Sequence, residues 1–476
     1  MTAAIATSDP RATAAGAELL AAGATAVDAA VAAALVLYVV EPQQCGLGGD
    51  AFVIHVPPGE SPIGLDGSGA LPMGLDDAAL SAAGLDTVPA RGAGTATVPG
   101  AYRLLEDAVA RFGTRTMGQL ATRAIELAEQ GFAVRPTLAA AAARAAAEIG
   151  DDPVLGPLYV PGGRPVVEGD VVRNPVVAGC LAALCEQGSN LLYDGPLGRA
   201  VVASLREAGG YLDESDLSAH ATLPVDLRST EFRGNTIWEL PPPTQGVAVL
   251  HALDSISAEM EHVESADDWS RAIEHMRAAM TAAGFDLSQI GARPAPPAQG
   301  DTTYIAAVDH DGGAASLITS LFGDFGSHFG VPALGGAIGN RATMLRALRR
   351  AMTPGAKPPH TTIPAAVTKE GVLQYVLGVA GGFMQPQAQV QVLVQLLERG
   401  LTPQDAIDAP RFRIGFGGTL SLEAGHPLCD AMPDAAARPP GPEGFGAAQV
   451  VAGPKAPGGV DAGADHRRNG VAQVVS

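Results

Sequence analysis

The segment Gly300-Asp301-Thr302-Thr303-Tyr304 constrains the fold most, because a polar step leads there into an apolar run of strand-like composition. The turn-forming residues Asp309 to Gly312 separate this run from a second apolar run that ends near Ser320. Such an arrangement predicts a β-hairpin. If the chain cuts itself before Thr302, the new N-terminal threonine has a hydroxyl nucleophile and an α-amine base of ordinary pKa about 8. A threonine pair also begins many ordinary strands, so this segment needs support from the rest of the chain.

Motifs on both sides of Thr302 follow the order typical of one family. Those before it are Thr25 to Ala34, Glu41-Pro42, Cys45 to Phe52, Val98 to Ala101, Ala124 to Phe132 and Pro241 to Gly246. Those after it are Asn340-Arg341, His360 to Ala365, Gly381-Gly382, Gln385 to Gln387 and Asp408 to Arg411. From Ala21 to about Val475 the chain therefore resembles the γ-glutamyltransferase family of N-terminal nucleophile hydrolases.

Composition allows a large core and excludes some partners. The chain has 476 residues, of which 47% are hydrophobic, so it can bury a large core, and its length allows two or three domains. Its formal net charge of −20 would repel a phosphate backbone, and we expect no nucleic-acid partner. The apolar stretch from Val31 to Val40 is too short to cross a bilayer.

The cysteines and the N-terminus indicate an intracellular protein without a metal. Four cysteines are too few and too scattered for a disulfide framework, and no pair has zinc-type spacing. Met1 to Pro10 lacks the basic and apolar regions of a signal peptide. We expect a cytoplasmic protein that needs no cofactor.

The order of helix-like and strand-like segments predicts an α+β protein rather than alternating βαβ units. Ala12 to Leu37 has the composition of two helices interrupted near Gly23. Phe232 to Leu240 predicts one strand that ends at three prolines. The Pro- and Ala-rich segment 292–299 predicts a flexible tether before Thr302.

The resemblance implies a four-layer αββα sandwich built jointly by two autocleaved fragments. It places the cut between Asp301 and Thr302, giving a large subunit, 1–301, and a small subunit, 302–476, that stay together as an αβ heterodimer or as (αβ)2. It assigns Thr302 as the nucleophile and the N–H groups of Gly381 and Gly382 as the oxyanion hole. Glycine suits that role because a Cβ would block close approach of the backbone.

The resemblance also implies contacts around the nucleophile. Ser320, eighteen residues after Thr302, matches a hydroxyl residue that bonds the nucleophile, although a serine at a strand end is as often simply solvated. Thr361 matches a hydroxyl residue that contacts the substrate. His360 precedes it, and we expect a substrate-pocket residue there rather than a catalyst.

The predicted substrate pocket departs from that of true transpeptidases. The segment Asp66 to Pro72 lacks their carboxylate-binding arginine: it has Gly67-Ser68-Gly69, as in an oxamate-hydrolysing branch, but Ala70 where that branch has arginine. Arg341 and Met344 align with the glutamine and aspartate that hold a glutamyl backbone, so γ-glutamyl transfer is disfavoured. Arg341 could instead bind a carboxylate through its planar fork, or be an ordinary surface or ion-pair arginine.

A small acyl group is the substrate that these departures favour. Phe383, beside the expected oxyanion hole, would make the pocket more apolar than in the oxamate-hydrolysing branch. We expect a small-molecule substrate with an oxalyl or α-keto-acid head and a less polar remainder. One alternative is a C–C bond hydrolase that releases oxalate in the biosynthesis of alkylproline antibiotics. Another is an uncleaved scaffold or binding protein.

Two further motifs have simpler explanations than a bound ligand. Gly46-Leu47-Gly48-Gly49-Asp50 lacks the Lys-Ser/Thr of a phosphate-binding loop and precedes a strand. Asp309-His310-Asp311 has the composition of a hairpin turn, which needs no metal.

Overall fold

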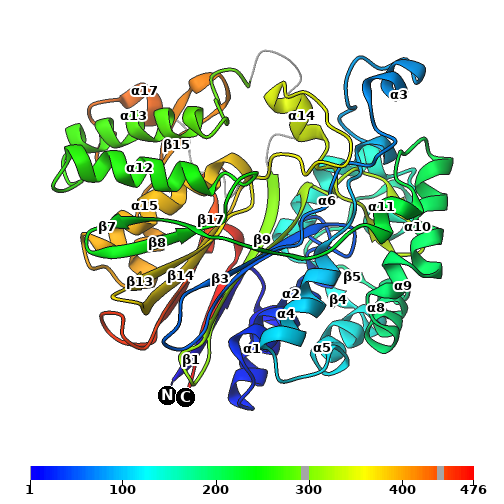
Figure 1. Cartoon of the computed structure of the whole chain (residues 1–476), viewed down its shortest axis with the longest axis horizontal. Coiled ribbons are helices and arrows are strands. Elements are labelled where there is room, and N and C mark those ends of the chain that lie inside the picture. The colour runs from blue at the N-terminus through cyan, green and yellow to red at the C-terminus, as the bar shows by residue number, and fades with distance from the viewer. Residues whose placement is uncertain (1, 291–299, 437–443) are drawn as a thin grey trace.

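The computed structural model describes residues 2–290, 300–436 and 444–476. Two antiparallel sheets lie face to face, and a layer of helices covers the outer face of each (Figure 1). This is the predicted α+β architecture with four αββα layers. The two ends of the chain lie side by side (Figure 1), because β1 and β19 pair antiparallel.

The first sheet has seven strands and includes the residues around Thr302. In spatial order they are β19 (Val471–Val475), β1 (Ala3–Thr7), β9 (Gly300–Val308), β10 (Ala314–Gly323), β2 (Asp50–Val56), β3 (Ile63–Asp66) and β6 (Leu223–Val225). The predicted hairpin is β9 and β10. Its turn is held by Asp309, whose carboxylate accepts from the N–H groups of Asp311 and Gly313 and, across the fold, from that of Ala26.

The second sheet has six strands. In spatial order they are β18 (Ala462–Ala464), β17 (Ala447–Ala452), β14 (Val372–Ala380), β13 (Pro364–Lys369), β8 (Asn235–Glu239) and β7 (Arg228–Phe232). The single strand predicted over Phe232 to Leu240 is wrong. Arg233 and Gly234 both have positive φ and turn the chain, so Phe232 ends β7 and pairs with Asn235 at the start of β8. Both sheets contain strands from before and after Thr302.

Side chains between the two sheets form a core of their own. It includes Phe52, Ile54, Tyr304, Ile318 and Val376, all at most 1% exposed. Alternate residues of β9 divide between this core and the helical side, as strand geometry requires. At the closest approach, a Cβ on Gly378 would lie 2.4 Å from the ring of Tyr304, so only glycine fits there.

The helices that cover the first sheet and its outer side come from the N-terminal half of the chain. They are α1 (Pro10–Ala21), α2 (Ala26–Val40), α4 (Ala101–Phe112), α5 (Met117–Gln130), α6 (Pro136–Ile149), α7 (Leu155–Tyr159), α8 (Pro175–Gln187), α9 (Asn190–Tyr193), α10 (Pro196–Glu207) and α11 (Glu214–Ser218). Every residue of α2 is buried, because this Ala- and Val-rich helix lies between the sheet and other helices. Thr25 and Asp28 begin α2 with a capping box.

A smaller set of helices covers the second sheet. They are α12 (Gly246–Glu259), α13 (Ala266–Ala282), α15 (Gln385–Leu397) and α16 (Pro403–Asp408). The remaining helices are α3 (Asp77–Ala82), α14 (Thr343–Leu348) and α17 (Pro433–Ala436), with 3-10 turns η1 (Ala93–Thr95), η2 (Pro161–Gly163), η3 (Gly382–Met384), η4 (Phe416–Gly418) and η5 (His466–Arg468). Two-stranded ladders join β4 (Phe132–Ala133) to β5 (Val171–Val172), β11 (Gly330–Val331) to β12 (Gly336–Ala337), and β15 (Phe412–Ile414) to β16 (Leu420–Leu422).

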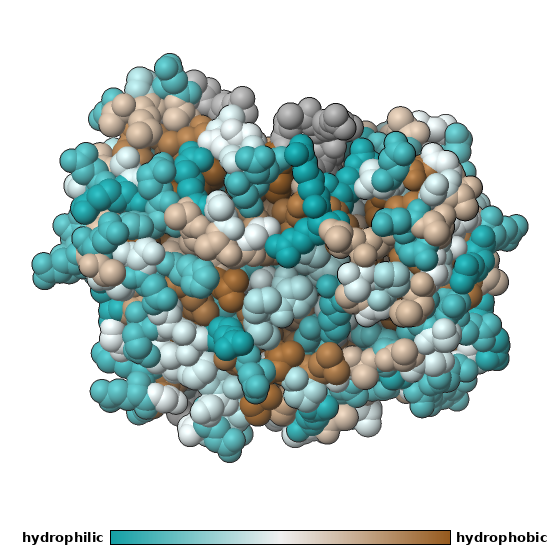
Figure 2. Space-filling model, turned by 45° about the horizontal axis from the view of Figure 1, so that its top comes forward, coloured by the Kyte–Doolittle hydropathy of each residue, from teal (hydrophilic) through white to brown (hydrophobic). Residues whose placement is uncertain are grey.

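Some sequence predictions concern features other than the layers. The tether predicted over 292–299 lies outside the described residues. All four cysteines are free. No helix among the described residues is both long enough and apolar enough to span a membrane. On the face seen in Figure 2, hydrophilic and hydrophobic residues are interspersed.

Candidate active site

Thr302 lies in a buried polar site near the start of β9. It is 1% exposed, and it lies two residues before Tyr304 on the face of β9 toward the second sheet. The chain is continuous through Gly300, Asp301 and Thr302, which all belong to β9. The predicted cut between Asp301 and Thr302 would therefore fall inside this strand.

Two side chains contact the Thr302 hydroxyl. Its Oγ1 donates to Ser320 Oγ at 3.2 Å, and Gln385 Nε2 is 3.5 Å from the same oxygen. The register between β9 and β10 shifts between Thr319 and Phe322, so the strand bulges at Ser320. Bulges re-aim side chains next to active sites. Ser320 is thus brought to Thr302, as the resemblance implies.

Arg341 is a buried arginine rather than a surface one, being 1% exposed. Its Nη1 donates to Thr361 Oγ1 at 3.2 Å and its Nη2 donates to Ser320 Oγ at 3.4 Å. Its Nε is 3.5 Å from Asp50 Oδ2, and the guanidinium lies over the ring of Phe322, 4.5 Å from the centroid. Arg341 thereby connects both predicted hydroxyl residues to a carboxylate.

Asp50 is the carboxylate at the centre of this site. Its Oδ2 accepts from His360 Nε2 at 3.0 Å, and its Oδ1 accepts from the Gly69 N–H at 2.8 Å. Burial acts to raise the pKa of Asp50, but the His360 hydrogen bond, the charge of Arg341 and the Gly69 N–H outweigh it and lower that pKa. Asp50 is therefore ionised at neutral pH.

His360 is a neutral partner of Asp50. Burial, reinforced by the nearby charge of Arg341, lowers its pKa to about 4. With Nε2 donating to Asp50, Nδ1 is free to accept from the Thr362 hydroxyl. The ring holds Asp50 and has no contact with Thr302 among the described residues.

Gly381 and Gly382 lie where β14 ends and η3 begins. Both have positive φ, 139° and 57°, and η3 packs against β9. Neither N–H donates a hydrogen bond to any described residue. Gln245 Nε2 bridges the carbonyl oxygens of Gly382 and Thr361, at 2.9 and 2.6 Å, which fixes the turn beside the site. That these two N–H groups form an oxyanion hole stays a prediction.

The remaining predicted pocket residues, Phe383 and Ser68, make no hydrogen bond to Thr302 among the described residues. Phe383 is 9% exposed and makes edge-to-face contacts with Phe285 and Phe416. Ser68 is fully buried, and both its hydroxyl and its N–H donate to Asp66. Ser68 therefore stabilises the loop, while its neighbour Gly69 reaches the site through Asp50.

Asp50, Gln245 and Gln385 also belong to the candidate site, although their sequence motifs alone do not predict it. Each lies in a motif that had been recognised: Asp50 ends Gly46-Leu47-Gly48-Gly49-Asp50, Gln245 follows the three prolines, and Gln385 begins the Gln-Pro-Gln step. Asp50 lay in a loop that was only weighed as a phosphate site. A buried carboxylate at the first residue of a strand was the available signal.

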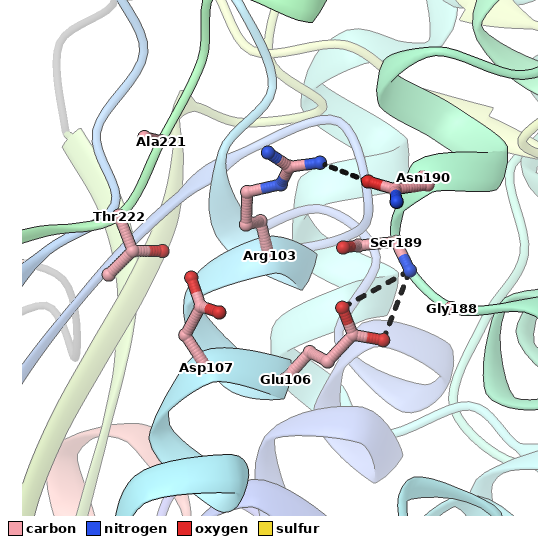
Figure 3. Close-up of a pocket in the computed structure, with 8 residues that line it drawn as sticks. All are labelled: Arg103, Glu106, Asp107, Gly188, Ser189, Asn190, Ala221 and Thr222. Atoms are coloured by element: carbon pink, nitrogen blue, oxygen red, sulfur yellow. Dashed lines mark hydrogen bonds between the residues drawn. The ribbon is translucent and has the colours of Figure 1, made fainter.

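A separate polar pocket of about 320 Å³ lies on the outer helical side, beside α4 and the start of α9. Figure 3 shows Arg103 pointing toward Asn190, and the Glu106 carboxylate toward the Ser189 N–H. Arg103 also stacks on the Tyr193 ring, 4.1 Å from its centroid. These groups hold the fold together, and none of them bonds to Thr302. No cluster of His, Cys, Asp or Glu within the described ranges could hold a metal ion.

Comparison with known proteins identifies the family of this chain. A family model described as gamma-glutamyltranspeptidase matches residues 12–289 and 281–475. The oxamate amidohydrolase proenzyme of Klebsiella pneumoniae is 30% identical over 433 residues, covering 83% of this chain and 81% of that protein. The acylase ACY 1 proenzyme of Pseudomonas sp. strain SE83 is 29% identical, covering 96% of this chain and 89% of that protein.

Solved structures agree as well. Cephalosporin acylase from Bacillus halodurans superposes with a TM-score of 0.88 at 31% identity, covering 99% of this chain and 95% of that one. LmbA2991HD shares the fold, with a TM-score of 0.85 at 23% identity, covering 99% of this chain and 98% of that one. The fold, the order of motifs and these matches lead to one conclusion: the chain belongs to the gamma-glutamyltranspeptidase family of N-terminal nucleophile hydrolases.

Proposed function

We propose that this protein is a self-processing N-terminal threonine hydrolase that cleaves a small acyl group from an amide. The observation that carries the proposal is the Thr302 hydroxyl, buried at the start of β9 and bonded to Ser320. Two relatives are named proenzymes, and the names oxamate amidohydrolase and acylase both describe cleavage of an acyl group from nitrogen.

In the proposed maturation, Thr302 Oγ attacks the carbonyl carbon of Asp301. The peptide C–N bond breaks, an ester forms, and the nitrogen of Thr302 becomes a free α-amine. Water then hydrolyses the ester and leaves the fragments 1–301 and 302–476. Because both sheets contain strands from both fragments, they would remain together as an αβ heterodimer.

In the proposed turnover, Thr302 Oγ attacks the substrate carbonyl and its α-amine takes the proton. The N–H groups of Gly381 and Gly382 stabilise the oxyanion. The C–N bond then breaks, and the leaving nitrogen takes the proton from the Thr302 amine. Water, activated by the same amine, attacks the acyl-enzyme, releases the acid and restores Thr302.

The acyl group in this proposal carries a carboxylate, as in oxamate. Arg341 supplies the positive charge, with N–H groups that already point at hydroxyl oxygens of the site. Met344 is fully buried in the core on the helical side of the second sheet and cannot replace the aspartate that holds a glutamyl ammonium. The edge of Phe383, with Phe285 and Phe416, offers an aromatic wall for a less polar leaving group.

The cytoplasmic location expected from the N-terminal sequence stays a prediction.

Intact-mass spectrometry of the wild type beside Thr302→Ala and Thr302→Ser tests this proposal. We expect two fragments that divide at Asp301–Thr302 in the wild type, one 48.0 kDa chain in Thr302→Ala, and slower cleavage in Thr302→Ser. Oxamate hydrolysis, followed by released oxalate and ammonia, should require the cut form. An uncut wild type would overturn the proposal and favour a binding protein.

A further inference from the structure

The start of β9 is paired with β10 on one side only, and the pairing is interrupted at Thr302. On one side, β1 pairs with β9 only at Ala306, Ala307 and Val308. On the other side, the bulge in β10 sets both Ser320 and Leu321 opposite Thr302. The Leu321 N–H donates to the Gln44 carbonyl at 2.8 Å instead of to β9. The ladder therefore pairs Asp301 and Thr303 but leaves Thr302 itself opposite the bulge, so side-chain bonds to its neighbours can help to fix its position.

Three buried side chains, Glu41, Ser8 and Thr303, form a hydrogen-bonded row that meets β9 at this point, on its helical side. Ser8 Oγ is 2.7 Å from Thr303 Oγ1, and the Ser8 hydroxyl donates to Glu41 Oε2 at 2.6 Å. The three residues are 0–4% exposed. Ser8 follows β1 and Glu41 follows α2, so this hydrogen-bonded row joins three segments that are distant in sequence.

The surroundings of Glu41 change the pKa of its carboxyl group. Burial, with the nearby charge of Asp9, raises its pKa to about 7, while the Ser8 hydrogen bond and the charges of Arg468 and Arg11 act the other way. The Ser8 hydroxyl has one hydrogen, and because it donates that hydrogen to Glu41, the Thr303 hydroxyl is the donor in its contact with Ser8. Both hydroxyls then have one defined orientation.

We propose that Glu41 and Ser8 are positioning residues that hold Thr303, and through it the nucleophile Thr302, in place for self-cleavage. The inference rests on the proposed function, since it presupposes the cut before Thr302. Glu41 and Ser8 precede that cut and Thr303 follows it. Chain ends fray unless they are tied down, so the same bonds would anchor the new N-terminus of the small fragment to the large one.

The test measures self-cleavage during cell-free synthesis, which needs no substrate. Ser8→Ala and Thr303→Val each remove one hydroxyl from the hydrogen-bonded row, while Thr303→Ser keeps a hydroxyl at position 303. Thr13→Val is the matched control. Thr13 is 1% exposed, forms a 2.8 Å hydroxyl pair with Thr7 and donates to the Val471 carbonyl of β19, and it makes no hydrogen bond to Thr303 or Glu41 among the described residues. Tm values of the same variants, measured on the uncut Thr302→Ala background, report folding alone.

We expect Ser8→Ala and Thr303→Val to slow cleavage at least tenfold. Thr303→Ser should stay within threefold of the wild type and Thr13→Val within twofold, with Tm losses similar across the set. Equal cleavage rates in Ser8→Ala, Thr303→Val and Thr13→Val would overturn the inference. So would slowing that follows Tm and is not rescued in Thr303→Ser. An uncut wild type would instead reject the proposed function, and the two failures are therefore distinguishable.

Discussion

Two buried charged clusters in this protein show opposite designs. In the first, which we name the structural cluster, Arg411, Arg467, Asp465 and Glu423 pair closely within the C-terminal part of the chain. Arg467 donates to both oxygens of Glu423, at 2.7 and 2.6 Å, and Arg411 Nη2 donates to Asp465 at 2.8 Å. Two cations meet two carboxylates through short charge-assisted hydrogen bonds.

The second, which we name the site cluster, contains Asp50, Arg341 and His360. Its ion pair is longer, with Arg341 Nε 3.5 Å from Asp50 Oδ2, and the terminal nitrogens of Arg341 bond to hydroxyls instead of carboxylates. Hydroxyl partners are weaker acceptors than carboxylates, so a substrate oxygen can displace them. A buried arginine can thus be bonded to carboxylates or mainly to hydroxyls, and we propose that the second arrangement leaves Arg341 able to bind a substrate carboxylate.

The largest expected effect is on the structural cluster. Arg467→Lys keeps the charge but loses the two-pronged contact with Glu423, so we expect the free energy of unfolding to fall by roughly 2–3 kcal/mol. Oxamate hydrolysis by the folded protein should stay unchanged. Urea unfolding measures the first expectation and steady-state kinetics the second. Lower activity with unchanged stability would show that Arg467 acts on the candidate site and not on the fold.

The same substitution in the site cluster should act in the opposite way. Arg341→Lys retains a positive charge near Asp50, but one ammonium cannot reach Ser320, Thr361 and a substrate carboxylate together. We expect kcat/KM for oxamate to fall about 100-fold, or ~2.7 kcal/mol, and the free energy of unfolding to fall by less than in Arg467→Lys, because the hydrogen bonds of Arg341 are longer. A loss of stability like that of Arg467→Lys, without the kinetic defect, would give Arg341 a purely structural role.

Acid should destabilise the site cluster through His360. Its pKa, lowered to about 4 in the folded state, lies below the ordinary value of about 6.5, so its contribution is present above 6.5 and is lost as pH falls toward 4. At pH 5 the loss is about 2 kcal/mol. His360→Gln keeps a donor for Asp50 and cannot take up that proton.

Urea unfolding at pH 7 and pH 5 measures this difference. The loss between the two pH values should be about 2 kcal/mol larger in the wild type than in His360→Gln. His220, His328 and His426, whose pKa values burial also lowers to about 4, are present in both proteins and cancel. Equal losses in both proteins would contradict the assignment.

The smallest expected effect sharpens the substrate side of the site. Phe383→Leu removes an aromatic edge from the wall with Phe285 and Phe416. We expect kcat/KM for N-phenyloxamate to fall about fivefold, roughly 1 kcal/mol, with oxamate unchanged. Phe412→Leu, which removes an aromatic contact with Trp269 instead, is the control. Equal losses for both substrates would exclude a leaving-group contact.

Local sequence patterns predicted several elements well. The β9–β10 hairpin follows from two apolar runs around Asp309 to Gly312, and α1 and α2 from breakers near Gly23. The prediction of a single strand over Phe232 to Leu240 was wrong because Arg233 adopts positive φ, which is uncommon for arginine and is not predictable from its side chain. The turn at Arg233-Gly234 was visible only as one glycine.

By itself, the sequence determined the family, the α+β layers and the candidate nucleophile Thr302, because motif order and hydrophobic pattern are local properties of the chain. The tertiary structure alone decided that Asp50, Arg341 and His360 form one cluster, and that Ser8 and Glu41 meet Thr303. These partners are separated by up to 310 residues. Their hydrogen bonds depend on how the two sheets and the buried helix α2 pack, and no spacing along the chain encodes that packing.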